Sequence, residues 1–415
     1  MAKSKIIEVM APIGSYESLS AAIQGGADSV YFGIEDLNMR SNSTSNFTIE
    51  DILKIVPICQ QHQIKTYLAV NTILYNNDLV SMRAIINTAR DAGISAIIAA
   101  DVAGMLYARD KGMEIHLSTQ LNISNIESLR FYAQFADVVV LARELTLEQV
   151  KEIRRQIVEQ KIKGPSSKLL RIEAFAHGAL CMAISGKCYL SLHEMNSSAN
   201  RGKCNQVCRR GYIVKDKQSE IELEIDNQYI FSSKDLKTIR FIDKMIDSGI
   251  EIFKIEGRAR GPEYVRVVTE CYKKAIKAYF ENNFTEKMKD TWDGQLRRVF
   301  NRGFWNGYYL GQRLGEWSNC YGNEALEKKM YIGKVVNYFP KIQVGEFLME
   351  TQELHKGDKV LITGPTTGAL FLKANEIRVN LLPVETAAQG ERFSMPVSEK
   401  IRPSDKIFKI TNRLR

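Results

Sequence analysis

Apolar runs alternate along the first two thirds of the chain with longer segments in which apolar residues recur at helical spacing. The longer segments predict helices, among them 49–61, 79–91, 127–135 and 147–159. The runs are rich in β-branched residues and predict strands at 6–10, 27–32, 65–70, 96–99, 114–117, 137–141, 169–175, 229–232 and 251–255. Because most of these strands are apolar throughout, they predict a parallel sheet that helices cover on both faces.

So many β-α units in one series favour a (β/α)8 TIM-like barrel over a doubly wound sheet. A barrel of this kind uses eight strands, so one of the nine predicted strands is expected to be an extra hairpin strand near residues 212–232. No Gly-x-Gly-x-x-Gly motif follows the first strand, which argues against a dinucleotide-binding fold. The predicted fold class is therefore α/β, with the barrel as its main body.

The pattern changes after the ninth strand. Residues 285–329 are rich in aromatic and basic side chains, and from residue 330 short strands are broken by turns at Gly357-Asp358 and Gly364-Pro365. Short strands with such turns are typical of a small antiparallel β-barrel or sandwich. We expect a TIM-like barrel at 1–284, a connector at 285–329 and a small C-terminal β-barrel domain at 330–415.

Composition and charge narrow the class of protein. The chain has 415 residues, of which 45% are hydrophobic and 25% charged, as in a globular protein. Its most apolar stretch, 94–106, is too short for a bilayer and contains Asp101, and the first residues lack the apolar core of a secretion signal. The sequence therefore predicts a cytoplasmic protein with no membrane association.

The positive charge is concentrated in one part of the chain. The net charge is +9, and residues 151–215 alone hold 13 Lys and Arg against 4 Asp and Glu. A solvated surface is the ordinary explanation of such an excess. The other is a face that binds phosphates or RNA, and it gains weight because most of the cysteines lie in the same part of the chain.

Four of the seven cysteines lie close together, with the spacing Cys-x6-Cys-x15-Cys-x3-Cys: Cys181, Cys188, Cys204 and Cys208. The Cys-x2-Cys pairs typical of structural zinc sites are absent, and so is the Cys-x3-Cys-x2-Cys loop of radical enzymes. Irregularly spaced thiolates on one loop-rich segment suit an iron–sulfur cube, whose irons take their ligands from different directions. The spacing alone leaves zinc, and buried core cysteines, as alternatives.

The sequence around these cysteines carries specific motifs: Glu173-Ala-Phe-Ala-His-Gly-Ala-Leu-Cys181, Ser185-Gly-Lys-Cys188 and Asn200-Arg-Gly-Lys-Cys204-Asn-Gln-Val-Cys208-Arg209. Together with Ala11-Pro-Ile-Gly14 and Lys254-Ile-Glu-Gly-Arg258, they closely resemble the signature of the peptidase U32 family. The resemblance covers roughly residues 5–310. It implies a 4Fe–4S cluster on the four cysteines, with Cys208 as the least certain ligand, because some members place a cysteine near 233–240 instead.

The resemblance also implies an activity. Better-understood members of the family look like oxygen-independent hydroxylases: one group forms 5-hydroxyuridine at the tRNA wobble position with prephenate, a second acts on an rRNA cytidine and a third on quinone precursors. One barrel with one short C-terminal domain looks most like the tRNA group. The collagenase-like peptidase label fits less well, because the chain has no His-Glu-x-x-His motif. A non-catalytic cluster or zinc protein that binds RNA is a third hypothesis.

A TIM barrel carries its chemistry at the C-terminal ends of the strands, where we expect the cysteine segment, residues 178–211, to cap the mouth. Arginine binds carboxylates in a bidentate manner. The residues expected to bind prephenate or a similar carboxylate donor are therefore Arg143, Arg201 and Arg258. The expected proton-transfer residues are Glu173, His177 and Glu256. Each of these side chains has a purely structural alternative, as an ion pair at the rim or a hydrogen bond within a loop.

The expected partners are tRNA, a small carboxylate donor and an electron-transfer partner. The aromatic and basic segment 297–313 is a candidate for holding tRNA by stacking and phosphate contacts. The alternative is that its aromatic residues wedge one domain onto the other.

Overall fold

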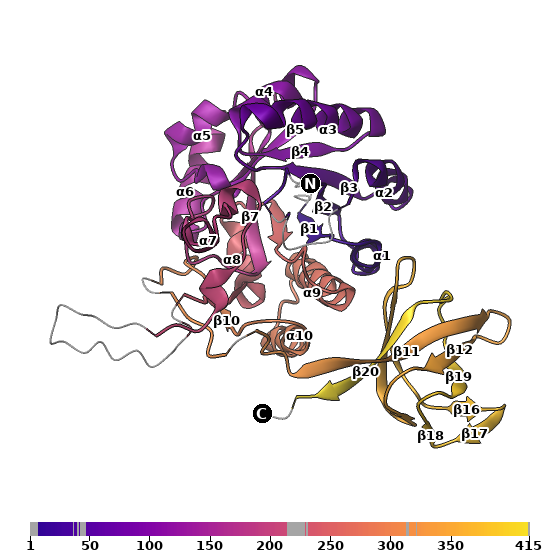
Figure 1. The fold of residues 1–415 in the computed structure, drawn as a ribbon. Coiled ribbons are helices and arrows are strands. Elements are labelled where there is room, and N and C mark those ends of the chain that lie inside the picture. The colour runs from indigo at the N-terminus through magenta and orange to yellow at the C-terminus, as the bar shows by residue number, and fades with distance from the viewer. Residues whose placement is uncertain are drawn as a thin grey trace.

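The computed structural model describes residues 7–35, 37–39, 41, 47–213, 229, 231–312, 315–320 and 322–413. The described residues form a barrel surrounded by helices and, beside it, an antiparallel sheet built from the C-terminal part of the chain (Figure 1). Each part has its own apolar core. No helix in the described ranges combines the length and the apolar character needed to cross a membrane.

Within the described ranges, eight parallel strands close into the barrel. In order around it they are β1 (Glu8–Pro12), β2 (Ser29–Gly33), β3 (Lys65–Val70), β4 (Ala96–Ala99), β5 (Glu114–Leu117), β6 (Val138–Val140), β7 (Arg171–Gly178) and β9 (Ile252–Ile255). Strand β9 pairs in parallel with both β7 and β1, and this double pairing closes the ring. The predicted (β/α)8 barrel is confirmed.

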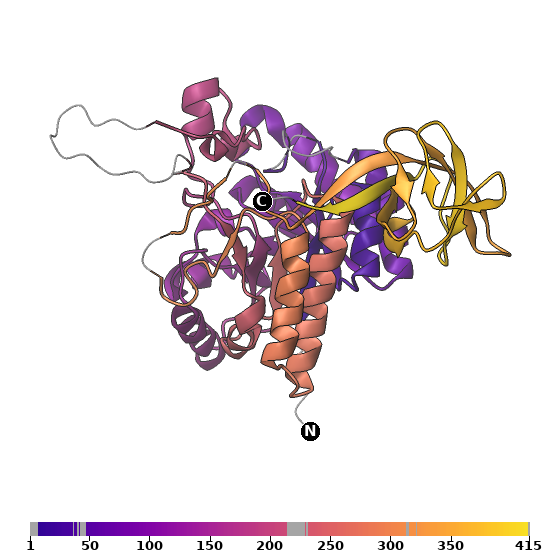
Figure 2. The same cartoon turned by 90° about the horizontal axis from the view of Figure 1, so that it is seen from below.

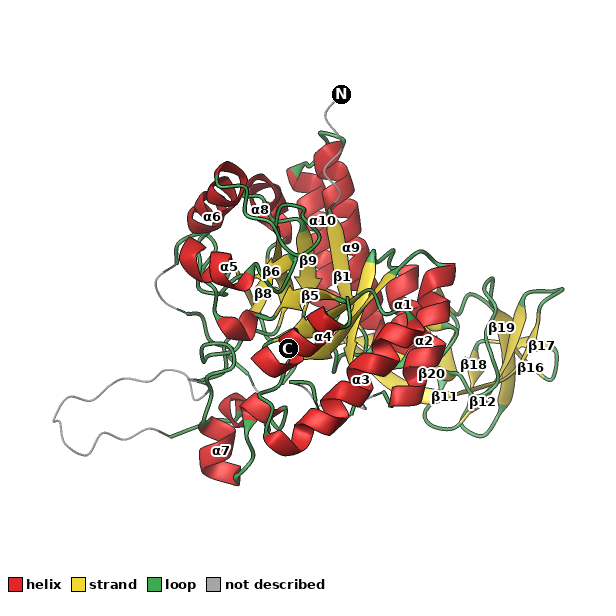
Figure 3. Ribbon diagram, turned by 90° about the horizontal axis from the view of Figure 1, so that it is seen from above, coloured by secondary structure: helices red, strands yellow, loops and turns green. Residues whose placement is uncertain are grey.

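Helices follow the strands and cover the outside of the barrel (Figure 3). They are α1 (Tyr16–Gln24), α2 (Ile49–Gln61), α3 (Leu79–Ala92), α4 (Val102–Asp110), α5 (Ile126–Tyr132), α6 (Leu147–Glu159), α8 (Ile242–Asp247) and α9 (Pro262–Phe280). Each longer helix buries one apolar stripe, as α2 does with Ile52, Ile55, Val56 and Cys59. The predicted helices at 49–61 and 147–159 are confirmed with their ends, and α5 ends three residues before the predicted 135.

One predicted strand is wrong. Tyr229, Phe231 and Ser232 form no strand, because Phe231 instead packs edge-to-face on Tyr212 at 5.2 Å and lines a cavity at the barrel mouth. The extra strand is β8 (Asp235–Lys237), which pairs antiparallel with the end of β7 and extends to β10 (Phe304–Trp305). The hairpin expected near 212–232 lies largely outside the described residues.

The C-terminal sheet has the strand order β15-β14-β20-β11-β12-β19-β16-β17 and is antiparallel. Its strands are β11 (Glu327–Phe339), β12 (Val344–Met349), β14 (Lys359–Gly364), β15 (Gly368–Lys373), β16 (Ile377–Val379), β17 (Leu382–Val384), β19 (Arg392–Pro396) and β20 (Lys406–Asn412), with a separate small pair of β13 (Leu354–His355) and β18 (Thr386–Ala387). Burial alternates along β12, as expected for a sheet with one face on a core.

The predicted connector 285–329 joins the two parts. It contains α10 (Glu286–Arg298), which lies alongside α9 on the outside of the barrel (Figure 2), and its last residues already belong to β11. The sheet is also held directly to the barrel helices, because Gln24 of α1 donates a hydrogen bond to Thr367 O at 2.9 Å and accepts one from Ala369 N at 3.0 Å.

Gly178 ends β7 and allows the cysteine segment to leave the barrel. Its φ is +102°, and a Cβ at this position would lie 2.2 Å from the carbonyl oxygen of Glu256, just after β9. A side chain would therefore separate the end of β7 from the end of β9 and move the first cysteine of the segment.

We predict that Gly178→Ala lowers the free energy of unfolding by at least about 2 kcal/mol, because it adds both an unfavourable φ and a clash with a backbone oxygen. Urea unfolding measures the effect. The matched control is Gly294→Ala in α10, where a Cβ meets nothing within 4 Å and the change should stabilise the helix by up to about 1 kcal/mol. Equal unfolding midpoints for the two variants would contradict this account.

Candidate functional site

A cavity of about 360 Å³ opens at the C-terminal ends of the barrel strands, beneath the cysteine segment. Its barrel side is lined by Tyr31 of β2, Ala69 of β3, Ile98 of β4, Val140 of β6, Phe175 of β7 and Lys254 of β9. Its other side is lined by residues from Cys181 to Leu190 and by Asn200 and the two later cysteines. The cysteine segment therefore covers the mouth of the barrel, where TIM barrels carry their active sites.

Short helices and fixed contacts hold the cysteine segment in place. It contains α7 (Leu190–Met195) and the 3-10 turns η3 (Ala199–Arg201) and η4 (Val207–Arg209). Arg209 donates hydrogen bonds to Leu180 O at 2.8 Å and Ser233 O at 2.5 Å. Asn122 donates to Ser185 O at 3.0 Å, and Asn200 O accepts from Ile73 N at 3.1 Å. The segment is thus tied to loops after β3 and β5 and to the start of β8.

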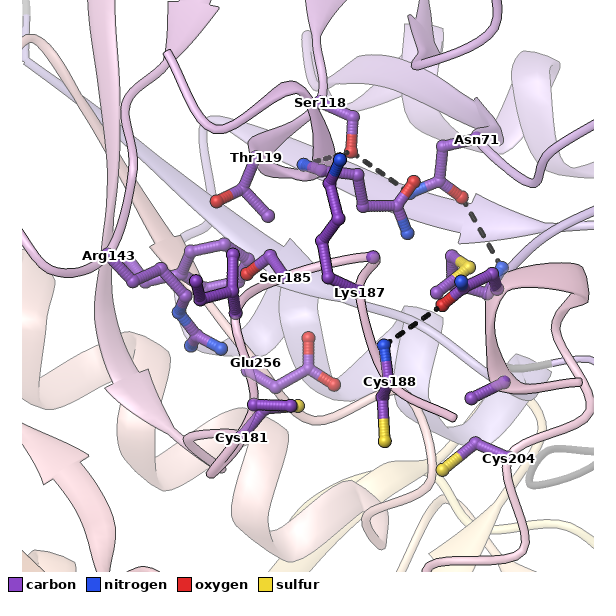
Figure 4. Close-up of a pocket in the computed structure, with 18 of the residues that line it drawn as sticks. Asn71, Ser118, Thr119, Arg143, Cys181, Ser185, Lys187, Cys188, Cys204 and Glu256 are labelled. Carbon is purple, nitrogen blue, oxygen red and sulfur yellow. Dashed lines mark hydrogen bonds between the residues drawn. The ribbon is translucent and has the colours of Figure 1, made fainter. Parts of the chain in front are cut away.

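The four clustered cysteines all line the same cavity. Figure 4 shows the sulfur atoms of Cys181, Cys188 and Cys204 turned toward a common space. Burial raises the pKa of the Cys208 thiol, the charge of Arg209 lowers it, and the other three cysteines raise it. The net effect is a pKa of about 11. The described ranges contain no group of three or more His, Cys, Asp or Glu side chains spaced to hold one metal ion. The site is therefore a pocket ringed by thiols, without a preformed cage for a single ion.

The four thiols fit a cluster in chemistry and in position. They supply sulfur donors alone, which iron–sulfur clusters prefer, and they approach the cavity from different points of one segment. A smaller adjoining cavity of about 70 Å³ is lined by three of these cysteines and three arginines, namely Cys181, Cys204, Cys208, Arg209, Arg260 and Arg302. These guanidinium groups would offset the negative charge of bound thiolates.

Four cations line the cavity: Arg143, Lys187, Lys254 and Arg258. The guanidinium of Arg143 stacks 4.0 Å from the ring centre of Phe175 and donates to Ala179 O at 3.1 Å. Its Nε is buried and has no hydrogen-bond partner among the described residues. Arg258, which is 6% exposed, donates to Asn38 at 2.9 Å. The cavity therefore suits a carboxylate.

Polar uncharged groups and one carboxylate complete the lining. Glu256 points into the cavity (Figure 4), and its carboxylate accepts a hydrogen bond from Tyr31 at 3.1 Å. On the opposite side, Asn71 donates to Ser118 at 3.3 Å. The amide and hydroxyl are of the kind that hydrogen-bond the edge of a heterocyclic base, and the carboxylate can accept or return a proton.

The sequence model of the peptidase family U32 matches residues 14–319. The chain belongs to this family. Three relatives show the range of names within the family. A collagenase of Porphyromonas gingivalis is 61% identical to this chain over 406 residues, which cover 98% of both chains. The tRNA hydroxylation protein P1 of Bacillus subtilis is 33% identical over 86% of this chain and 83% of its own length. A 23S rRNA 5-hydroxycytidine synthase of Escherichia coli is 30% identical over 87% of this chain and 53% of its own length.

Not every residue expected to act in this U32 chain reaches the cavity. Among the predicted residues, Arg143, Arg258, Glu256 and the four cysteines line it. Arg201 does not, because it forms an ion pair with Asp78 and lies 3.9 Å over the ring of Tyr75. These contacts hold η3 against the start of α3. Arg201 therefore has the structural role that was the alternative to binding a carboxylate.

Glu173 lies beneath the cavity and does not line it. The side chain is fully buried, with one oxygen 2.7 Å from Lys254 Nζ and the other 2.8 Å from His116 Nδ1. Burial alone would raise the pKa of Glu173, but Lys254 and His116 outweigh it and hold this pKa at about 2. Glu173 is therefore a permanent carboxylate that positions Lys254, and it does not supply protons by its own titration near neutral pH.

Lys254 is a cavity residue that the sequence analysis missed. It is 5% exposed and its Nζ lies 4.5 Å from the ring centre of Tyr31. A lysine in the middle of the apolar strand 251–255 was the available signal, because lysine is rarely buried without a specific partner.

The aromatic segment 297–313 packs against the barrel. Trp305 is 4% exposed and donates to Lys234 O at 3.1 Å, and Tyr309 is 6% exposed and donates to Phe175 O at 2.9 Å. Arg260 lies 3.5 Å over the ring of Phe300. These rings hold the connector to the barrel, which is the alternative to stacking on RNA bases.

His177 is also outside the cavity. Its buried ring packs against Tyr264, Tyr272 and Phe304, with ring centres 5.4 to 5.9 Å away. Burial, and then the ammonium of Lys237, lowers the pKa of His177 from 6.5 to about 3. This neutral imidazole in a ring cluster has the environment of a packing residue, and no contact of His177 supports the expected proton transfer.

We predict that His177→Phe makes stability less dependent on pH. In the unfolded chain the imidazole takes a proton below about pH 6.5. In the fold it stays neutral down to about pH 3, so acid progressively favours the unfolded chain. Between pH 7 and pH 4 the variant should lose about 3 kcal/mol less of its unfolding free energy than the wild type. Urea unfolding at both pH values measures this, and parallel losses in the two proteins would contradict it.

Proposed function

We propose that this U32 protein holds a 4Fe–4S cluster on Cys181, Cys188, Cys204 and Cys208 and hydroxylates a pyrimidine base of RNA without using O2. The specific reaction proposed is the formation of 5-hydroxyuridine at the tRNA wobble position. The observation that carries this proposal is the convergence of four thiols, four cations and one carboxylate on a single cavity at the barrel mouth.

Relatives and charge support RNA as the substrate. The Bacillus subtilis relative, named a tRNA hydroxylation protein, aligns over 86% of this chain, and the segment 151–215 carries 13 Lys and Arg against 4 Asp and Glu. The cavity of about 360 Å³ lies in the range of small-molecule pockets and is large enough for one extruded nucleobase. This protein would encounter tRNA in the cytoplasm.

The residues of the cavity have distinct roles in this proposal. When bound, the cluster supplies redox or Lewis-acid chemistry beside the cavity. Arg143 and Arg258 bind the carboxylates of a donor such as prephenate. Asn71 and Ser118 hydrogen-bond the edge of the base, while Glu256, oriented by Tyr31, accepts the proton that leaves the base. Phe175 and the cysteine segment limit the access of water.

A redox partner follows from the same chemistry. Cys181 is exposed, so a cluster bound to it would lie near the protein surface. An electron-transfer protein could therefore approach the cluster from the solvent side of the cysteine segment without entering the barrel.

Peptidase activity is the second candidate, because the relative with 61% identity is named a collagenase. The described residues that line the cavity include no histidine, so no cysteine or serine there has an imidazole base beside it. Incubation of the cluster-loaded protein with collagen and casein tests this candidate. Cleavage that persists after Cys188→Ser would favour a peptidase that does not need the cluster.

We predict that tRNA from a strain lacking the gene contains no 5-hydroxyuridine or its derivatives, as measured by nucleoside mass spectrometry. Expression of the wild-type gene should restore them, and expression of the Cys188→Ser variant should not. Unchanged 5-hydroxyuridine in the deletion strain would contradict the proposal. If 5-hydroxycytidine of rRNA disappeared instead, the substrate would be rRNA.

We also predict that serine at any of the four clustered positions lowers bound iron, acid-labile sulfide and broad visible absorption after anaerobic purification, because each thiolate binds one corner of the cluster. The matched control is Cys320→Ser, since Cys320 is half-buried and does not line the cavity. Wild-type iron content in all four variants would contradict the assignment of these ligands.

A further inference from the structure

Three arginines lie around the smaller cavity of about 70 Å³, which three of the clustered cysteines also line. They are Arg209, Arg260 and Arg302. One buried aspartate accompanies them, because Asp235 Oδ1 lies 3.6 Å from a terminal nitrogen of Arg302. We call these four residues the arginine group.

The members of the arginine group come from four separate segments. Arg209 belongs to η4 of the cysteine segment, Arg260 follows β9, Asp235 begins β8 and Arg302 precedes β10. The pairing of β8 with β10 brings the last two together, because Asp235 N donates to Gly303 O at 2.9 Å. The group is therefore assembled only when the barrel, the connector and the cysteine segment are all in place.

The charges of the group are buried and held in fixed positions. Asp235 is 1% exposed and Arg302 is 8% exposed. The guanidinium of Arg260 lies 3.5 Å from the ring centre of Phe300, and that of Arg302 lies 5.3 Å from the same ring. Arg209 is fixed by the hydrogen bonds described above. These contacts prevent the guanidinium groups from turning out into solvent.

Positive charge exceeds negative charge in this region. Three guanidinium groups accompany two carboxylates, since Glu256 also lines the small cavity. Asp235 offsets Arg302 only in part, because their closest atoms are 3.6 Å apart and Asp235 Oδ1 has no hydrogen-bond partner among the described residues. Burial lowers the pKa of Arg302 to about 10 despite Asp235, so this side chain is still a cation at neutral pH.

A buried excess of positive charge is costly unless an anion lies beside it. The three cysteines of the small cavity provide that anion when their thiolates bind an iron–sulfur cluster. Reduction by one electron makes such a cluster, with its thiolates, more negative by one charge. Fixed positive charges nearby therefore stabilise the reduced form more than the oxidised form.

We propose that the arginine group raises the reduction potential of the cluster, and that Arg302 and Asp235 are positioning residues whose opposite charges set this potential. The inference rests on the cluster of the proposed function, but not on its RNA substrate. A higher potential allows a weaker reductant to supply the electron. One electron leaves the electron-transfer partner and enters the cluster, and no covalent bond or proton of the arginine group changes.

The test is a reductive titration of the anaerobically purified, cluster-containing protein, followed by visible absorption and electron paramagnetic resonance. Arg302→Met removes a cation but keeps an unbranched side chain. At the wild-type midpoint its ratio of reduced to oxidised cluster should fall at least about threefold. Asp235→Asn removes an anion of nearly the same shape and should raise that ratio at least about threefold.

The opposite signs separate an electrostatic role from a packing role. Loss of packing alone has no reason to shift the potential in opposite directions in the two variants. Equal potentials in wild type and both variants, or shifts of the same sign, would overturn the inference. Arg260→Met removes a second cation and should shift the potential in the same direction as Arg302→Met, which keeps the inference testable if one variant fails to fold.

The matched control is Lys341→Met, in the exposed turn between β11 and β12 of the C-terminal sheet. It removes the same charge from the chain as Arg302→Met, but solvent and salt screen it from the barrel mouth. Its potential should therefore equal that of the wild type. A shift as large as that of Arg302→Met would show that net charge, and not the arginine group, sets the potential.

Failure of this inference can be distinguished from failure of the proposed function. If the anaerobic wild-type protein contains no iron and no acid-labile sulfide, both fall. If the potentials shift as predicted but tRNA of the deletion strain keeps its 5-hydroxyuridine, the proposed substrate is wrong and the role of the arginine group stands. If 5-hydroxyuridine is lost but the variants titrate like the wild type, only this inference falls.

Discussion

The pairing of β7 with β9 is the constraint on which the site depends. Strand β7 leads into the cysteine segment, and β9 contains Lys254 and leads into Glu256 and Arg258, yet 73 residues (179–251) separate the two strands in the sequence. The parallel register that joins Glu173 to Ile252 and Phe175 to Lys254 places both sets at one end of the barrel. Gly178 completes the arrangement, because only a residue without a Cβ can pass so close to the carbonyl oxygen of Glu256.

The barrel divides its stabilising and functional roles between two surfaces. The apolar core lies mainly between the strands and the surrounding helices, where residues such as Val30, Leu68 and Ile97 are fully buried. The inside of the barrel holds buried charged residues such as Glu173, Lys254 and His116 beside a small apolar cluster. Because packing against the helices already supplies most of the burial, the interior can hold charges that would be too costly in the main core. This division allows one fold to keep buried ion pairs below a cavity that carboxylates and bases could enter.

The sequence alone predicts the elements well because parallel barrel strands are apolar throughout and lie between helices with clear stripes. It also identifies the residues after the strands, since their places follow from the topology. It does not decide what Arg201 or His177 does, because their partners are Asp78 and Tyr272, far away in the sequence. The run at 229–232 fails as a strand for a similar reason: Phe231 is used to line the cavity. Whether Lys254 is a core or a cavity residue depends on Glu173, which only the closed barrel brings to it.

The central claim is that one iron–sulfur cluster lies over the barrel mouth, bound by the four thiols that line the cavity. Anomalous diffraction at the iron absorption edge, from crystals grown without oxygen, tests it most directly. We predict a strong iron peak surrounded by the sulfur atoms of Cys181, Cys188, Cys204 and Cys208, above Lys254 and Glu256. A single zinc ion, disulfides among these cysteines, or an iron peak elsewhere in the molecule would contradict the account.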